Sequence, residues 1–193
     1  MPNIRIAHAG DAPEVAAIYR PYVTDAVTSF EIDPPAAGEM AVRIGAVLAR
    51  APWLVCTDAG GAVIGYAYAS RHHERAAYQW SVDVAVYIHA AHHRGGIGRA
   101  LYDKLFALLR IQGFYVAHAG ITLPNAASVG LHEALGFVPV GVYPAVGWKF
   151  GAWRDVGWWR LPLHDPTPTP APPLSVAEAQ ALPAWAALLP PRG

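Results

Sequence analysis

Residues 81–99 read SVDVAVYIHAAHHRGGIGR, and this stretch decides the fold of the chain. Its first part is rich in β-branched and aromatic residues, as strands are, and carries one carboxylate, Asp83. Its second part, Gly95-Gly96-Ile97-Gly98, is a glycine-rich turn that opens a helix. Glycines let a ligand approach the backbone, successive N–H groups point outward, and the helix N-terminus adds positive potential. The stretch therefore predicts a strand, a turn and a helix that together bind a phosphate group.

Two well-known phosphate-binding turns do not fit this stretch. A P-loop requires Lys followed by Ser or Thr after its last glycine, whereas Arg99 and Ala100 follow Gly98 here. A dinucleotide-binding fold requires an acidic residue about 20 positions further on, where this chain has Ala117-His118-Ala119. Taken alone, the turn is also compatible with an ordinary connection between a strand and a helix.

Composition narrows the class of protein. The chain has 193 residues, which fits one domain with a good core and an appendage. Its formal net charge is zero and only 15% of its residues are charged, which argues against nucleic acid or an anionic membrane as a partner. Cys56 is the single cysteine and lies in an apolar run, so we expect a buried thiol. We find no signal segment and no apolar stretch of about 18 residues, so we expect a cytoplasmic protein.

The pattern of elements predicts an α/β fold with a mixed sheet and helices on both faces. The expected order is β, α, α, β, β, β, α, β, α, β, β. The expected strands are 4–6, 53–57, 62–70, 81–88, 115–122, 137–143 and 153–163, and the expected helices begin at Asp11, Met40, Ile97 and Asn125. Residues 1–163 form the predicted domain. Residues 164–193 are a proline-rich tail, partly extended with one weak helix at 175–189, which we expect to be disordered or packed on a neighbouring surface.

A second motif strengthens the functional assignment. Residues 123–137 read LPNAASVGLHEALGF, and Asn125, Ser128 and His132 are spaced three and four apart, so one helical face carries all three. This segment and the glycine turn, in this order, resemble the two motifs of the GNAT N-acetyltransferase superfamily. The resemblance implies the GNAT acyl-CoA N-acyltransferase fold, in which a central splayed mixed sheet is flanked by helices.

Four further segments narrow the resemblance. Residues 52–55 (PWLV), 76–80 (AAYQW), 132–136 (HEALG) and 147–157 (GWKFGAWRDVG) are similar to the phosphinothricin acetyltransferase family, which includes enzymes that act on methionine sulfone and methionine sulfoximine. The resemblance covers roughly residues 3–173. It implies acetyl transfer from acetyl-CoA to the α-amino group of a small amino acid or analogue, by a homodimer.

Two residues are the candidates for proton transfer. The α-ammonium of an amino acid must lose a proton before it attacks a thioester, and the departing thiolate must gain one. Asp83 is the carboxylate on the central strand just before the turn, where family members place a Glu as the general base; the alternative is a structural carboxylate paired with an Arg or His. His132 stands where many superfamily members place a Tyr that protonates the thiolate, and its alternative is a histidine that is only hydrogen-bonded in the cleft.

The cofactor contacts follow from the resemblance. The superfamily pattern of the pyrophosphate loop is Gln or Arg, two residues, Gly, one residue, then Gly or Ala, and this chain has His93 at the first position. Backbone groups on the strand would pair with the pantetheine arm, and a free N–H there would polarise the thioester carbonyl. The predicted acetyl-CoA contacts are Val86, Tyr87, Ile88, His93, Arg94, Gly95, Gly96, Ile97, Gly98, Arg99, Asn125 and Ser128.

A cation must recognise the carboxylate of the acceptor amino acid. Arg75 matches the family's substrate-side Arg, and Tyr78 and Phe30 could line the same pocket. The alternatives are an exposed Arg and a loop residue anchored in the core. The pairs His72-His73 and His92-His93 do not predict a metal site, because adjacent side chains point in different directions and no Cys or carboxylate joins them at ligand spacing.

Two other functions remain open from the sequence. One is the same fold with a different acceptor amine, and the other is a non-catalytic acyl-CoA-binding sensor. Asp83 and His132 argue against the sensor, because a passive binder needs neither. A nucleic-acid-binding module is disfavoured by the neutral charge.

Overall fold

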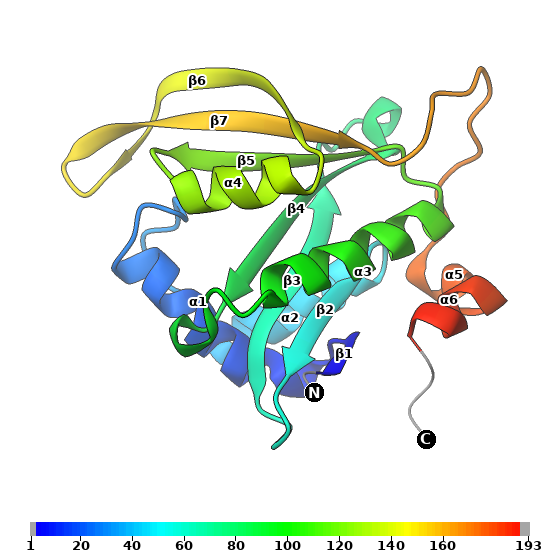
Figure 1. Ribbon diagram of the computed structural model, residues 1–193, viewed down its shortest axis with the longest axis horizontal. Coiled ribbons are helices and arrows are strands. Elements are labelled where there is room, and N and C mark those ends of the chain that lie inside the picture. Colours follow the sequence, from blue (N-terminus) through cyan, green and yellow to red (C-terminus); the bar gives the residue numbers. More distant parts are fainter. Residues whose placement is uncertain (1–2, 190–193) are drawn as a thin grey trace.

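A seven-stranded mixed sheet forms the centre of the molecule, and helices cover both of its faces (Figure 1). The computed structural model describes residues 3–189. The strands are β1 (Asn3–Ile6), β2 (Trp53–Thr57), β3 (Val63–Arg71), β4 (Ser81–Ile88), β5 (Val116–Leu123), β6 (Val138–Lys149) and β7 (Ala152–Pro162), in the spatial order β1-β2-β3-β4-β5-β7-β6. The pair β4–β5 is parallel and the others are antiparallel. The predicted α/β fold is confirmed.

The helices fall into two layers. They are α1 (Ala12–Thr24), α2 (Ala37–Leu48), α3 (Ile97–Gln112), α4 (Ala126–Ala134), α5 (Val176–Gln180) and α6 (Pro183–Leu188), with short 3₁₀ turns η1 (Ala9–Asp11), η2 (Ala76–Tyr78) and η3 (Ala90–His92). One core lies between α1, α2 and the sheet, and the other lies under α3. Alternate strand residues point to opposite faces, so Leu54 and Cys56 belong to the α3 core, while Trp53 and Val55 pack under α1 and α2. The buried thiol of Cys56 was expected.

The sheet splits at its centre. β4 pairs with β5 only through residues 81–83 and 116–118, while it pairs with β3 along residues 82–88. Beyond this short junction β5 continues to Leu123 alongside β7. The second half of β4 therefore has one edge that no strand within residues 3–189 covers, and α4 lies beside β5 across this gap (Figure 1).

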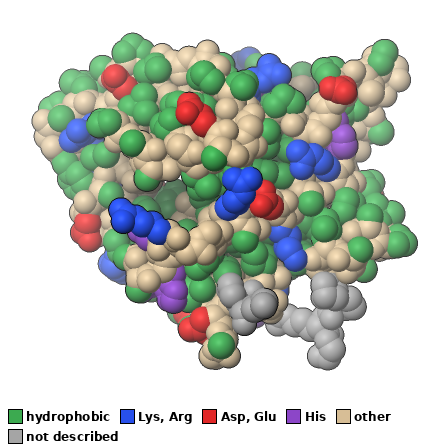
Figure 2. Space-filling model, in the orientation of Figure 1, with side chains coloured by type: hydrophobic (Ala, Val, Ile, Leu, Met, Phe, Trp, Pro, Cys, Tyr) green, Lys and Arg blue, Asp and Glu red, His purple; other side chains and the backbone are tan. Residues whose placement is uncertain are grey.

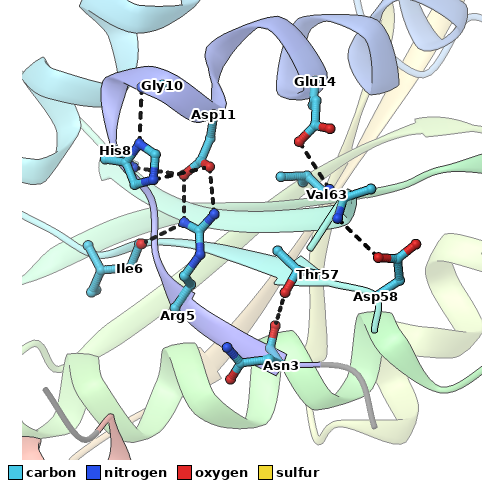
Figure 3. Close-up of polar contacts among 11 residues, drawn as sticks. Asn3, Arg5, Ile6, His8, Gly10, Asp11, Glu14, Thr57, Asp58 and Val63 are labelled. Carbon is cyan, nitrogen blue, oxygen red and sulfur yellow. Dashed lines mark hydrogen bonds and ion pairs between the residues drawn. The ribbon is translucent and has the colours of Figure 1, made fainter. Parts of the chain in front are cut away.

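A polar network fixes the start of the chain and corrects one expectation (Figure 3). Asp11 was predicted to cap α1, but its side chain makes no cap hydrogen bond there. It accepts two hydrogen bonds from Arg5, at 2.7 and 2.6 Å, and one from the backbone N–H of His8. His8 caps the 3₁₀ turn that precedes the helix. The Arg5 guanidinium thus binds the Asp11 carboxylate in place of the helix N-terminus. Two charge-assisted hydrogen bonds from one guanidinium are stronger than a hydrogen bond from a backbone N–H.

The end of the chain packs on its own domain. Two short helices, α5 and α6, stand in place of the single helix expected at 175–189, and they separate at Pro183, which holds the preceding residue in an extended conformation. Trp185 is 3% exposed and belongs to the same core as α3. Gln112 donates to the carbonyl of Leu174, and Lys104 donates to that of Leu188. The tail therefore packs on the domain as far as residue 189, and the rest of the predicted tail, residues 190–193, lies outside the described residues.

The hairpin β6–β7 presents an apolar surface. Large hydrophobic side chains that are half exposed or more lie along both strands and their turn: Val138, Val140, Val142, Tyr143, Val146, Trp148, Phe150 and Trp153. Figure 2 shows hydrophobic side chains over this part of the molecule with only scattered charged groups among them. We call these residues the hairpin face. Strand β6 was expected to end at Tyr143, but it continues to Lys149.

Candidate active site

The open edge of β4 faces a cavity under α4. The carbonyl of Ile88 accepts a hydrogen bond from the Tyr22 hydroxyl at 2.6 Å, and the N–H of His89 donates to Ile64 on β3. Because backbone groups alternate in direction along a strand, those of Val84 and Val86 point into the gap and those of Tyr87 point to β3. Of the three strand residues predicted to contact the cofactor, Val86 is thus the one whose backbone is open.

The cavity itself brings the two sequence motifs together. Its walls come from β4, β5, α3 and α4, with one residue from the loop after α1. The lining residues are Thr28, Val84, Ala85, Val86, Tyr87, Tyr102, Ala119, Gly120, Ile121, Thr122, Asn125, Ser128 and His132. Five predicted site residues therefore line one cavity: Val86 and Tyr87 of β4, and Asn125, Ser128 and His132 of the second motif.

The glycine turn lies at one end of this gap. Arg94 and Gly96 have φ angles of +62° and +76°, and the second of these left-handed residues is the N-cap of the 16-residue helix α3. Ile97 is buried and anchors the turn, whereas Arg94, Gly95 and Gly96 are exposed. The left-handed conformation turns successive N–H groups outward at a helix N-terminus, which is the geometry of an anion site.

Two side chains of the predicted turn have partners within the protein. The Nε2 atom of His93 lies 3.0 Å from the Ile88 carbonyl and 3.1 Å from the Tyr22 hydroxyl, so this imidazole ties the turn to the end of β4. Arg99 donates to the carbonyl of Ala134 at 3.3 Å and thereby links α3 to α4. Gly98 faces Leu131 of α4, and a Cβ at this position would lie 3.5 Å from it.

The helical face of Asn125, Ser128 and His132 is formed as expected. Asn125 caps α4, because its side chain accepts a hydrogen bond from the Ser128 N–H at 3.1 Å. His132 is 4% exposed, and burial lowers its pKa, so the imidazole is neutral at neutral pH. Its Nδ1 lies 2.7 Å from the Ser128 carbonyl and must donate, which makes Nε2 the acceptor for the Tyr102 hydroxyl at 3.2 Å.

Tyr102 is a residue that the sequence reasoning missed. It lies in the middle of α3, 30 positions from His132, and the pattern of α3 accounts for it as an ordinary core residue. Burial raises the pKa of its phenol, so the hydroxyl keeps its proton. Only the approach of α3 and α4 reveals that it is the partner of His132.

Asp83 lies outside the lining of this cavity, at the junction of β4 and β5. Its neighbours Val82 and Val84 face the α3 core, so the Asp83 side chain points to the opposite face of the sheet. There its Oδ1 lies 2.7 Å from Nδ1 of His72. Burial raises the pKa of Asp83, although the bond to His72 works in the opposite direction. A carboxylate with a raised pKa is a better proton acceptor near neutral pH.

Two of the three predicted substrate residues are neighbours, because the backbone N–H of Tyr78 donates to the carbonyl of Arg75 at 3.0 Å, and Phe30 lies in a different segment. Phe30 packs over β6 at Gly147, where a Cβ would overlap its ring. Tyr78 is close to His73 and His72, with ring centroids 4.7 and 6.0 Å apart. Arg75 borders a separate cavity, which is lined by Arg50, Arg71, His73, Glu74, Arg75, Ala76 and Gln79. Tyr78 therefore lies on the Asp83 side of the sheet, whereas Arg75 does not share a cavity with His132.

Two negative findings apply to residues 3–189. Within this range no cluster of three or more His, Cys, Asp or Glu side chains is arranged to hold a metal ion. No helix in the same range is long and apolar enough to cross a membrane.

Comparison with known proteins agrees with this geometry. The model of the acetyltransferase (GNAT) family matches residues 18–137, which include β4, the glycine turn and α4. The chain belongs to the GNAT family. A phosphinothricin N-acetyltransferase of Streptomyces viridochromogenes is 39% identical to this GNAT protein over 166 residues, which is 86% of this chain and 90% of the relative. An L-methionine sulfoximine/L-methionine sulfone acetyltransferase of Pseudomonas paraeruginosa is 37% identical over 169 residues, or 86% and 96% of the two chains.

Solved structures give the same family. The crystal structure of a GNAT superfamily phosphinothricin acetyltransferase from Sinorhizobium meliloti in complex with AcCoA is similar to this GNAT protein with a TM-score of 0.83. The two chains are 36% identical, and the similarity covers 89% of this chain and 96% of the other. The resemblance drawn from the sequence motifs is therefore confirmed.

Proposed function

We propose that this protein is an N-acetyltransferase that transfers the acetyl group of acetyl-CoA to the α-amino group of a small amino acid or a close analogue. Phosphinothricin, methionine sulfone and methionine sulfoximine are the candidate acceptors, by analogy with the named relatives. The observation that supports this best is the gap between β4 and β5, which opens between the glycine turn at one end and Asp83 at the other. A protein that only bound a phosphate group would need the glycine turn but not Asp83.

The residues present fit acetyl-CoA. The exposed turn at 94–96 offers N–H groups at the start of α3 for the pyrophosphate, and the backbone groups of Val84 and Val86 offer pairing for the pantetheine arm. The group supplies an activated acetyl thioester when it is bound. The N–H of Val86 would then polarise the thioester carbonyl, and Asn125 and Ser128 would border the thiol end.

We assign the proton transfers to Asp83 and His132. Asp83 would accept a proton from the acceptor ammonium, directly or through a water, which frees the nitrogen lone pair to attack the carbonyl carbon. The new C–N bond forms as the C–S bond breaks, and the thiolate takes up a proton. Because burial keeps His132 neutral, it holds no spare proton at neutral pH. His132, with the Tyr102 hydroxyl at its Nε2, would instead relay to the thiolate the second proton, which the nitrogen loses once the C–N bond has formed.

We place the acceptor on the face of the sheet that carries Asp83. Tyr78 would line this site, and Phe30 would border it from the loop after α1. Arg75 makes no side-chain hydrogen bond or ion pair within residues 3–189, so its guanidinium is available for the carboxylate of the amino acid.

The oligomeric state and the cellular location are two further parts of the proposed function. We propose that two copies associate through the hairpin face, because an exposed apolar surface on a long edge strand is typical of an interface. We also propose that the protein acts in the cytoplasm, where acetyl-CoA is available.

The decisive experiment follows release of the CoA thiol from acetyl-CoA with a panel of acceptors. The panel contains phosphinothricin, methionine sulfone, methionine sulfoximine, the common amino acids and several simple amines, with Asp83→Asn as the isosteric control. We expect selective turnover of the glutamate-like or methionine-derived compounds and its loss in Asp83→Asn. Turnover only with amines that lack a carboxylate would remove Arg75 from its role. Tight binding of acetyl-CoA without any turnover would instead make the protein a sensor.

A further inference from the structure

A histidine that no motif contains contacts the proposed general base. His72 follows β3 directly, and the antiparallel register of β3 and β4 pairs Ser70 with Asp83. This register brings Nδ1 of His72 to 2.7 Å from Oδ1 of Asp83. An ionised carboxylate only accepts hydrogen bonds, so Nδ1 carries the proton and donates it to Asp83.

A second histidine fixes the ring of the first. His118 on β5 lies beside Asp83 in the parallel register, and its ring stacks on that of His72 with centroids 4.2 Å apart and planes inclined by 14°. Burial, with His72, Arg160 and His73 nearby, lowers the pKa of His118 to about 4, so this ring is neutral at neutral pH. A neutral ring stacked in this way holds the plane of His72 without adding a charge that would compete for Asp83.

We propose that His72 is a positioning residue for acetyl transfer: it holds Asp83 through Oδ1 and leaves Oδ2 free for the acceptor amine. Within residues 3–189, no hydrogen bond reaches Oδ2, and the Asp83 side chain is 31% exposed while that of His72 is 18% exposed. The proton of the ammonium then moves to Oδ2, and the nitrogen keeps the electron pair that forms the amide bond. This inference rests on the proposed function.

The arrangement has a consequence for the dependence of activity on pH. Burial raises the pKa of Asp83, and the bond from His72 lowers it in part, with a smaller contribution from His73. Tyr68 on β3 also faces Asp83, and Arg160 on β7 acts on the neighbouring His118. Loss of the bond from His72 should therefore raise the pKa of Asp83 further. The acid limb of the pH profile, where activity falls as Asp83 becomes protonated, should move to higher pH.

Two substitutions separate the bond from the packing. His72→Phe keeps an aromatic ring over His118 but removes the donor, whereas His72→Asn keeps a donor near the position of Nδ1. We expect His72→Phe to lower kcat about tenfold or more, because the proton acceptor Asp83 is no longer held in position, and to shift the acid limb upward by about one pH unit. His72→Asn should recover most of the lost kcat and most of the shift of the acid limb. The KM for acetyl-CoA should stay unchanged in both variants. His73→Phe is the matched control: His73 makes no hydrogen bond to Asp83 and lowers its pKa less than His72 does, so this variant should shift the acid limb less than His72→Phe.

A measurement without turnover completes the test. The carboxyl carbon of Asp83 can be titrated by ¹³C NMR in the wild type, His72→Phe and His72→Asn. A higher pKa in His72→Phe, restored in His72→Asn, would support the proposal, and an unchanged titration would overturn it. If the wild type transfers no acetyl group to any acceptor, the proposed function fails, and the titration alone then decides whether His72 controls the charge of Asp83.

Discussion

Lys149 on β6 donates a hydrogen bond to the backbone carbonyl of Ser29, 2.6 Å away, although the two residues are 120 positions apart in the chain. The same ammonium also donates to the carbonyls of Val23 and Glu31, and the Lys149 side chain is 3% exposed. This single cation therefore holds the loop after α1, with Phe30 at its centre, against the hairpin. The loop, which the sequence presented as irregular, is fixed at Ser29 and Glu31, and the third carbonyl belongs to the last turn of α1.

Replacement of this cation should loosen the loop. We expect Lys149→Met to lower the free energy of unfolding by about 2–4 kcal/mol, because three buried carbonyls lose a charged donor. The KM for the acceptor should rise, while the KM for acetyl-CoA should change little. The chain's other lysine provides the control: Lys104→Met removes one bond to the tail and should leave the acceptor KM unchanged. Urea denaturation and steady-state kinetics measure both.

A glycine on β6 tests the placement of Phe30. Gly147→Ala would bring a Cβ into the Phe30 ring, whereas Gly141→Ala on the same strand would meet no atom within 4 Å. We expect the first variant to displace the ring and raise the KM for the acceptor several-fold, and the second to behave like the wild type. Equal acceptor kinetics in the two variants would place Phe30 outside the substrate pocket.

The pair of Asp11 and Arg5 should make stability depend on acid pH. Burial works against the charge of Asp11, yet the bonds from Arg5 and His8 hold its pKa below the ordinary value of 3.8. A carboxylate with a lowered pKa contributes stability above its unfolded pKa and loses it as the pH falls through the folded one. We expect Asp11→Asn to lower the free energy of unfolding by about 1–3 kcal/mol at pH 7. The difference from the wild type should shrink below about pH 4, as measured by urea denaturation at several pH values.

The tail should contribute to the stability of the whole domain. Trp185 is buried in the α3 core, so we expect Trp185→Ala to lower the free energy of unfolding by about 3–5 kcal/mol. Val42→Ala is the control, since that side chain on α2 is 72% exposed and lies outside the hairpin face. If thermal denaturation gave Trp185→Ala the melting temperature of the wild type, the packing of α6 would have no energetic role.

The hairpin face should control the oligomeric state. A charge at Val142, which is 51% exposed on β6, would oppose burial against a second copy. We expect Val142→Glu to shift a dimer to a monomer in sedimentation experiments. Val42→Glu, on the exposed side of α2 at 72% exposure, should leave the sedimentation unchanged. A wild type that sediments as a monomer would contradict the proposed interface.

The sequence predicted those parts of the site that depend on local pattern. The strand, the glycine turn and the face of α4 each lie within one short stretch, so periodicity and glycine placement determine them. The hairpin of β2 and β3 follows from its turn residues in the same way, with an observed start at Val63. The fold class then followed from the order of the elements.

The missed contacts all join distant positions. The bond between His72 and Asp83 depends on the register of β3 and β4, and the stack of His72 on His118 requires a third strand. The partnership of Tyr102 with His132 depends on how closely α3 approaches α4. No single stretch of sequence carries the information on which residues meet, because strand register and helix packing are decided by the whole core. The roles of the site residues remain predictions that the experiments above will test.

The packing of the tail also constrains how the chain is made. The core under α3 is completed by Trp185 and Leu189, which are synthesised long after α3 itself. The part of α3 that packs against α5 and α6 therefore stays uncovered on the ribosome until residue 189 has emerged, whereas the part that packs on the sheet is covered earlier. Synthesis of the last part of the tail is thus a requirement for closing this part of the core.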